Sequence, residues 1–496
     1  MPETATHVDI DVQPLADHGV LQQAPVANWS HPAPGAFEDW SAALTTFCAS
    51  VEATSDPWPA CAATAPRALA AVSWSPCTRQ RVPLASIESW SSRAVVALLV
   101  ANQYSEFSRE LPSSGSAYTF VTEGLGARFG FLTAWIGILA LALGVPYSFI
   151  VMSANLQTLL LRYAGVNIPW PVFFVGAIGL IFALCYWGIR ESLRIDLTFL
   201  TFEIGVCLVL AVIILFHVGS TSGLPLSPFT TAGVPANGDL SIGIVLSVLS
   251  FIGFETAAAL GEETRNPHRN IPRAIFGSMI VVGVFYVLMV YAATVGYGPG
   301  RMATGYGADA APFDTLGRAF GGPTFALLVD IVGIASFFGA ALAIVNGGAR
   351  ILYAASREGA LPRWLAWTHP TRGTPVAGVV MLCGIGLVTG LGLGAFLSPF
   401  DAFTFLGTMD AILVLLIYVL VNLACILFFA RKRRAQFSVL RHGIIPALGL
   451  LITAGIVVAA MASPGDGALS YIPIIVAVWL AVGLLLLLVT RGKLAR

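Results

Sequence analysis

The hydrophobic pattern divides the chain near residue 93. Residues 1–92 contain no apolar stretch of about 20 residues, the length that crosses the hydrocarbon core of a membrane. The most apolar part, residues 58–74, is interrupted by two prolines and Arg67. We therefore predict that residues 1–92 form an irregular or disordered segment without a membrane helix.

Apolar runs follow one another closely from residue 94 onward. The run at 94–107 covers only about half to two-thirds of a membrane span, whereas later runs reach full spanning length. This pattern predicts an all-α, polytopic transmembrane domain over residues 94–490. The ten full-length runs lie at 131–161, 171–188, 197–218, 240–260, 275–295, 325–346, 376–397, 400–430, 444–462 and 471–489.

Composition supports a membrane protein. Hydrophobic residues make up 57% of the 496 residues and charged residues only 10%, against about a quarter in soluble domains. The lipid bilayer is therefore the expected environment, and no nucleic-acid partner is expected. The seven cysteines form no CxxC pair and the histidines no HExxH motif, so we expect no metal, no disulfide framework and no cofactor.

Basic residues predict the orientation of the domain. If the turn at Arg109 is cytoplasmic, most later arginines and both lysines fall in loops on that same side, as the positive-inside rule requires. The exceptions are Arg162, Arg301 and Arg318. We predict that the protein lies in the cell membrane with its C-terminus on the cytoplasmic side.

The stretch 246–274 contains the strongest functional signal. Glu255 falls near the middle of an apolar run, where an ionised side chain costs several kcal/mol unless it faces a cavity or a partner. Gly253 permits non-helical backbone, and the neighbouring hydroxyls of Ser250 and Thr256 can take up the freed hydrogen bonds. We predict two to four non-helical residues between Ser250 and Glu255, beside a cavity. The alternative is a continuous, kinked helix with a buried Glu255.

Three motifs here resemble a known family. FIGFE, then EETRNP at 262–267 and IPRA at 271–274, resemble the sixth helix of the amino acid, polyamine and organocation transporter superfamily. The resemblance implies a five-plus-five inverted-repeat (LeuT-like) fold with extra C-terminal helices. It also implies that unwound backbone binds the substrate amine, as broken membrane helices do. The implied substrate-binding residues are Ser250, Phe251, Ile252, Gly253, Phe254 and Glu255.

Two positions depart from the family pattern. The family's first helix, with a glycine-rich break that binds the substrate carboxylate, has no counterpart in residues 38–93, so we expect this helix to be missing. Glu203 occupies the position where some proton-coupled relatives carry a lysine. A carboxylate there can titrate or bind a cationic substrate group, and a paired structural acid is the alternative.

Other polar residues receive structural interpretations. Arg350, Arg357 and Glu358 belong to a second family-like stretch, 337–375, and fit a solvated or paired helical extension. Asp330, Asp410, Asn346 and Asn422 are expected to form hydrogen bonds between helices.

We interpret the chain as a secondary active transporter that moves amino acids by alternating access, with a proton as the expected co-substrate. The alternatives are a carrier of polyamines or other organic cations and a truncated, inactive permease. No P-loop accompanies the apolar spans, which argues against an ATP-driven pump. The sequence shows no cluster of His, Asp or Ser in catalytic spacing, which argues against a membrane enzyme.

Overall fold

The computed structural model describes residues 87–187, 189–229, 250–302, 305–306, 309, 311–462, 465 and 467–489. All of them belong to the second of two units of the chain, Ser55–Arg496. Within these ranges every regular element is a helix, which confirms the all-α class. The expected irregular N-terminal segment and missing first helix lie outside the described residues, apart from 87–92.

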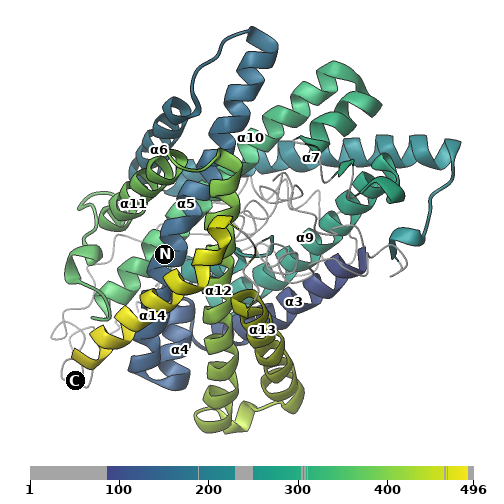
Figure 1. Cartoon of the computed structure of the whole chain (residues 1–496). Helices are drawn as coiled ribbons and strands as arrows, with labels where there is room; N and C mark the ends of the chain where they lie inside the picture. Colours follow the sequence, from purple (N-terminus) through teal and green to yellow (C-terminus); the bar gives the residue numbers. More distant parts are fainter. Residues whose placement is uncertain are drawn as a thin grey trace, which may run out of the picture. The chain divides into compact units, whose positions relative to one another are not determined.

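Figure 1 shows the helices of the described residues. The α-helices are α3 (Ile87–Glu110), α4 (Ala117–Leu125), α5 (Ala127–Ala164), α6 (Trp170–Trp187), α7 (Ile189–Thr221), α9 (Pro267–Tyr297), α10 (Pro312–Arg357), α11 (Val376–Gly394), α12 (Pro399–Arg431), α13 (Ile445–Ala462) and α14 (Ile472–Val489). Short helices are η3 (Ser227–Phe229), η5 (Phe254–Leu260), η6 (Pro299–Arg301), η8 (Arg363–Ala366), η9 (Arg434–Gln436), the π-helix η10 (Val439–Ile444) and η11 (Gly467–Tyr471).

Most of the expected spans correspond to helices that can cross a membrane. Eight helices in the described part of the chain are long and apolar enough to do so. The expected span at 171–188 is α6, a shorter apolar helix, and residues 240–249 of the expected sixth span lie outside the description. The chain is therefore a multi-pass membrane protein.

Helix α3 differs from its expected length. It begins at Ile87, upstream of the apolar run at 94, and has 24 residues. Its first turns read IESWSSR, which contains no proline or glycine to break a helix but is too polar to register as a span. Hydropathy therefore detected only the apolar part of this helix.

Helix α5 lies at the centre of the helical packing. It contacts α4, α6, α10, α11, α12 and α14, and it contains Pro146 in its interior. Small residues allow neighbouring helices to approach closely, as is common in membrane proteins. At Gly124 of α4, a Cβ atom would lie 2.6 Å from the backbone oxygen of Ala424 in α12, so this contact requires glycine.

Helices α12 and α13 are joined at one end of the domain through η9 and η10 (Figure 1). The buried His442 of η10 stacks on Phe429, and its Nδ1 accepts the N–H of Ser438. Because Nδ1 is an acceptor, Nε2 carries the proton and donates to Glu106 of α3 at 3.1 Å. A buried polar contact thus links α3 to the start of α13.

Candidate functional site

The backbone is broken where the sequence predicts it. Residues 250–253 form turns, Gly253 has φ 118°, and a 3-10 helix follows from Phe254. The N–H of Thr256 donates to the carbonyl of Gly253, three residues back and not four. This confirms the predicted non-helical stretch and rules out a continuous helix through Gly253.

Side chains from three elements hold the break in place. Oε2 of Glu255 accepts the N–H of Gly253 at 2.9 Å and the hydroxyl of Tyr418 at 3.0 Å. The hydroxyl of Thr256 donates to the carbonyl of Gly253. The Tyr286 hydroxyl of α9 donates to the Ser250 carbonyl at 3.3 Å. Three backbone groups at the break, the N–H and carbonyl of Gly253 and the carbonyl of Ser250, therefore have side-chain partners.

Two carbonyls at the centre of the break have spare acceptor capacity. The carbonyls of Phe251 and Ile252 receive no hydrogen bond from the described part of the chain. Both residues are buried, with 2% and 8% of their surface exposed. A buried carbonyl is a strong acceptor that favours a donor partner. These two carbonyls can accept hydrogen bonds from a further donor. Binding of a substrate amine by them stays a prediction.

A cavity of about 60 Å³ adjoins the break. Glu255 and Tyr418 line it, together with small and aliphatic residues such as Ala140 and Val414. Tyr104 also lines it, and its hydroxyl is buried without a hydrogen-bond partner among the described residues. The Tyr104 ring packs edge-on against Phe254, with the ring centroids 5.4 Å apart.

Sequence reasoning missed Tyr104 and Tyr418. They lie on α3 and α12, far from the break along the chain, and a tyrosine in an apolar run is unremarkable on its own. Of the six predicted site residues, Glu255 lines the cavity, while Ser250, Phe251, Ile252 and Phe254 are buried around Gly253.

Glu203 lies on α7 and is completely buried. It does not line the cavity but is within electrostatic range of Tyr286, the residue that binds the Ser250 carbonyl. Tyr286 therefore interacts with both Glu203 and the break. A role of Glu203 in coupling stays a prediction.

Ion pairs connect the segment after the break to the end of α10. Arg357 Nη2 lies 2.8 Å from Glu262 Oε1, which also accepts the hydroxyl of Ser114 at 2.8 Å. The Arg357 guanidinium, assisted by Ser114, lowers the pKa of Glu262 to about 2. Arg350 pairs with Glu263 in the same way, at 2.6 Å. Of the two expectations for Arg350 and Arg357, solvated or paired, the structure shows the paired one.

Among the described residues, no group of three or more His, Cys, Asp or Glu side chains is arranged to hold a metal ion. Asn422 fulfils the structural role expected of it, since it accepts from Gln103 of α3 and donates to the Tyr418 carbonyl.

Comparisons with known proteins identify the chain's relatives. A family profile described as amino acid permease matches residues 79–488. The branched-chain amino acid permease BcaP of Lactococcus lactis is 28% identical over 389 residues, which cover 73% of this chain and 79% of that protein. BcaP of Bacillus subtilis is 29% identical over 349 residues, covering 66% and 71%. The methylthioribose transporter of Bacillus subtilis is 27% identical over 426 residues, covering 81% and 84%. The family match includes the break, Tyr104 and Tyr418.

Proposed function

This chain belongs to the amino acid permease family, and we propose on that premise that it carries aliphatic amino acids across the cell membrane by alternating access with a proton as co-substrate. Members of this family are transporters and not enzymes. No bond of the substrate changes, so the polar groups at the break serve recognition and conformational change.

The unwound backbone at 250–253 is the observation that carries the proposal. The carbonyls of Phe251 and Ile252, which accept no hydrogen bond from the described residues, supply acceptors for the substrate ammonium group. The oxygen of Glu255 that accepts from Gly253 and Tyr418 holds the backbone in this shape. Irregular backbone at membrane depth persists where it faces a cavity or has protein partners. A cavity lined by Glu255, two residues after Gly253, lies next to this stretch.

The apolar surroundings support an aliphatic side chain. Phe254 and Tyr104 lie edge to face beside the break, and small or aliphatic residues form much of the cavity wall. No basic residue lines this cavity. Two relatives are named as branched-chain amino acid permeases, which agrees with an aliphatic substrate.

Two buried carboxylates are candidates for the transported proton. Glu255 lies two residues after Gly253, and Glu203 lies in α7 within electrostatic range of Tyr286 in α9. A carboxylate in an apolar interior binds a proton more readily than in water, because burial disfavours its charged form. Alternate protonation of such a group during the transport cycle would couple proton flux to substrate movement.

The test is uptake of labelled L-leucine by the full chain in proteoliposomes. An inward proton gradient should accelerate uptake, and a proton ionophore should remove the acceleration. Excess L-isoleucine should compete, whereas spermidine and methylthioribose should not. Glu203→Gln should retain leucine exchange but lose the response to the gradient. If spermidine or methylthioribose competed with leucine and L-isoleucine did not, the proposed substrate class would be wrong. If wild-type uptake did not respond to the proton gradient, proton coupling would be wrong.

A further inference from the structure

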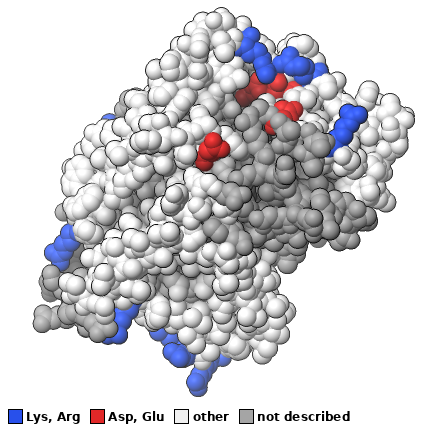
Figure 2. Space-filling view, in the orientation of Figure 1, with Lys and Arg blue, Asp and Glu red and all other residues white. Residues whose placement is uncertain are grey.

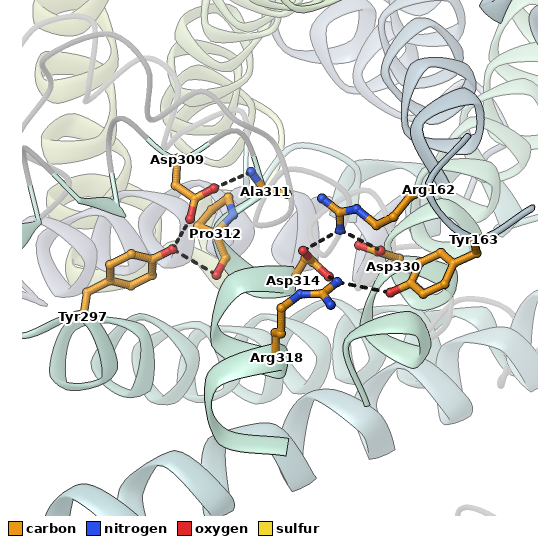
Figure 3. A network of polar contacts seen from close by, with 9 residues as sticks. All are labelled: Arg162, Tyr163, Tyr297, Asp309, Ala311, Pro312, Asp314, Arg318 and Asp330. Carbon is orange, nitrogen blue, oxygen red and sulfur yellow. Dashed lines mark hydrogen bonds and ion pairs between the residues drawn. The ribbon is translucent and has the colours of Figure 1, made fainter. Parts of the chain in front are cut away.

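A second cluster of charged residues surrounds Arg162 and Arg318. The predicted topology places these two arginines on the outer side of the membrane and Arg357 on the cytoplasmic side. Arg162, at the end of α5, places Nη1 2.6 Å from Oδ2 of Asp314. Arg318 approaches the other oxygen of Asp314 at 3.3 Å and also donates to the hydroxyl of Tyr163. Figure 3 shows these side chains converging from α5 and from the first turns of α10.

Asp330 completes the cluster from the other side of a bend in α10. Gly322, with φ 84°, separates the short first part of this helix from the long part that carries Asp330. Arg162 therefore faces one carboxylate from each part. Two of the three arginines that the topology placed on the outer side thus lie in one network with acids (Figure 3). The space-filling view shows basic and acidic side chains next to one another near the top of this face (Figure 2).

The charges in this cluster are unevenly satisfied. Only 5% of the Asp314 side chain is exposed, and each of its two oxygens is paired with an arginine. Asp330 is 3.9 Å from Arg162, beyond the range of about 2.7–3.2 Å for a hydrogen bond. Arg162 keeps 42% of its side chain exposed and uses one terminal nitrogen for both acids. Asp330 can therefore accept a further donor, and Arg162 can donate further hydrogen bonds.

A cavity lies between these incompletely bonded groups. It has a volume of about 60 Å³ and is lined by Arg162, Asp314 and Asp330, by the polar Asn155, and by the apolar Phe313 and Ile334. At about 10–15 Å³ for each water-sized position, it holds roughly four to six such positions. That is close to the five heavy atoms of an ammonium group, an α-carbon and a carboxylate.

We propose that this cavity is an outer binding site for a zwitterionic α-amino acid, with its ammonium group on Asp330 and its carboxylate on Arg162. A simple cation would be repelled by Arg162 and Arg318, and a simple anion by Asp330. A ligand that carries both charges next to each other complements both groups. The assignment rests on the proposed transport of amino acids and adds a first contact on the side from which substrate enters.

The experiment counts binding sites for tritiated L-leucine on the purified full chain in lipid nanodiscs. The wild type should bind two equivalents, and Asp330→Asn should bind one, because the amide keeps the shape but loses the charge-assisted bond. The matched control is Asp401→Asn, an exposed acid that bonds only the Ser398 cap of its own helix among the described residues. This control should bind two equivalents.

Gly253→Val should remove the inner site and leave the outer one. In that variant, 4-methylvalerate and 3-methylbutylamine, which each lack one of the two charges, should compete with leucine at least about tenfold more weakly than L-isoleucine does. Asp330→Asn should also raise the KM of uptake with little change in the maximal rate.

The outcomes separate this site from the proposed function. A single equivalent in the wild type that Gly253→Val abolishes would overturn the outer site and leave transport at the break intact. Two equivalents in Asp330→Asn, or equal competition by either singly charged analogue, would also overturn it. Absence of leucine binding to the wild type would contradict the proposed function itself.

Discussion

The hydroxyl of Tyr418 lies 3.0 Å from Oε2 of Glu255, the same oxygen that accepts the N–H of Gly253. One carboxylate oxygen thus joins α12 to the unwound backbone. Any movement of the break relative to α12 must change or break this bond. The pair therefore couples the shape of the break, the proposed substrate site, to the packing of a neighbouring helix.

Tyr418→Phe removes this hydroxyl and leaves the ring that packs beside Tyr104 and Phe254. A hydrogen bond to a charged group contributes about 1.5–3 kcal/mol, so we expect leucine uptake to fall by about tenfold or more. Uptake rates in proteoliposomes measure the effect. Tyr471→Phe, at a residue with 63% of its surface exposed, is the control and should transport normally. Equal rates for both variants would show that the bond is dispensable.

Tyr104→Phe should separate binding from stability. Its buried hydroxyl has no hydrogen-bond partner among the described residues, so its removal should leave the unfolding temperature unchanged or slightly higher. If the hydroxyl binds substrate in the cavity, the affinity for leucine should fall by roughly fivefold to tenfold, about 1 kcal/mol. Thermal unfolding and leucine binding are measured on the same sample. A lower unfolding temperature with unchanged affinity would assign Tyr104 to packing alone.

Glu262 gives a prediction about pH. Its pKa is about 2 in the folded chain, against 4.5 for the free group, chiefly because Arg357 bonds its charged form. The ion pair therefore stabilises the fold above a pH of about 4.5, and this contribution is lost as the pH falls toward 2. Both side chains are about 40% exposed, so the effect is small, under about 1 kcal/mol.

The measurement compares the unfolding temperatures of wild type and Glu262→Gln across a pH series. The difference should be constant from about pH 8 to pH 5 and shrink below about pH 4.5. In an Arg357→Gln background the same substitution should have little effect at any pH. A difference that grows on acidification would have the wrong sign for this pair.

The sequence alone located the break because its signal is local. Gly253, Glu255 and the hydroxyls of Ser250 and Thr256 are neighbours in the chain, and each is unusual inside an apolar run. Tyr104 and Tyr418 could not be found in this way, since only the packing of α3, α12 and η5 brings them together. Hydropathy defined the spans well and failed at α3, whose first turns are helical but polar.

The outer cluster shows the same limit. Arg162 and Arg318 stood out in the sequence as exceptions to the charge asymmetry, but nothing in the pattern paired them with Asp314 or Asp330. Asp330 was expected to bond between helices, and it instead lies 3.9 Å from Arg162 at the edge of a cavity. Arg162 and Asp330 lie on different helices, and no local pattern predicts how α5 and the bent α10 pack together.

The central claim is that substrate recognition depends on the unwound backbone at Gly253, and a pair of glycine substitutions tests it most directly. Gly253 has φ 118°, where an alanine is strained by about 1–3 kcal/mol, so Gly253→Ala should oppose the break. Gly277 lies within α9 with nothing within 4 Å of an added Cβ, and alanine suits a helix, so Gly277→Ala is the matched control. Leucine uptake per folded molecule in proteoliposomes should fall by about tenfold or more in Gly253→Ala and stay at the wild-type rate in Gly277→Ala. Equal uptake by the two variants would contradict the claim.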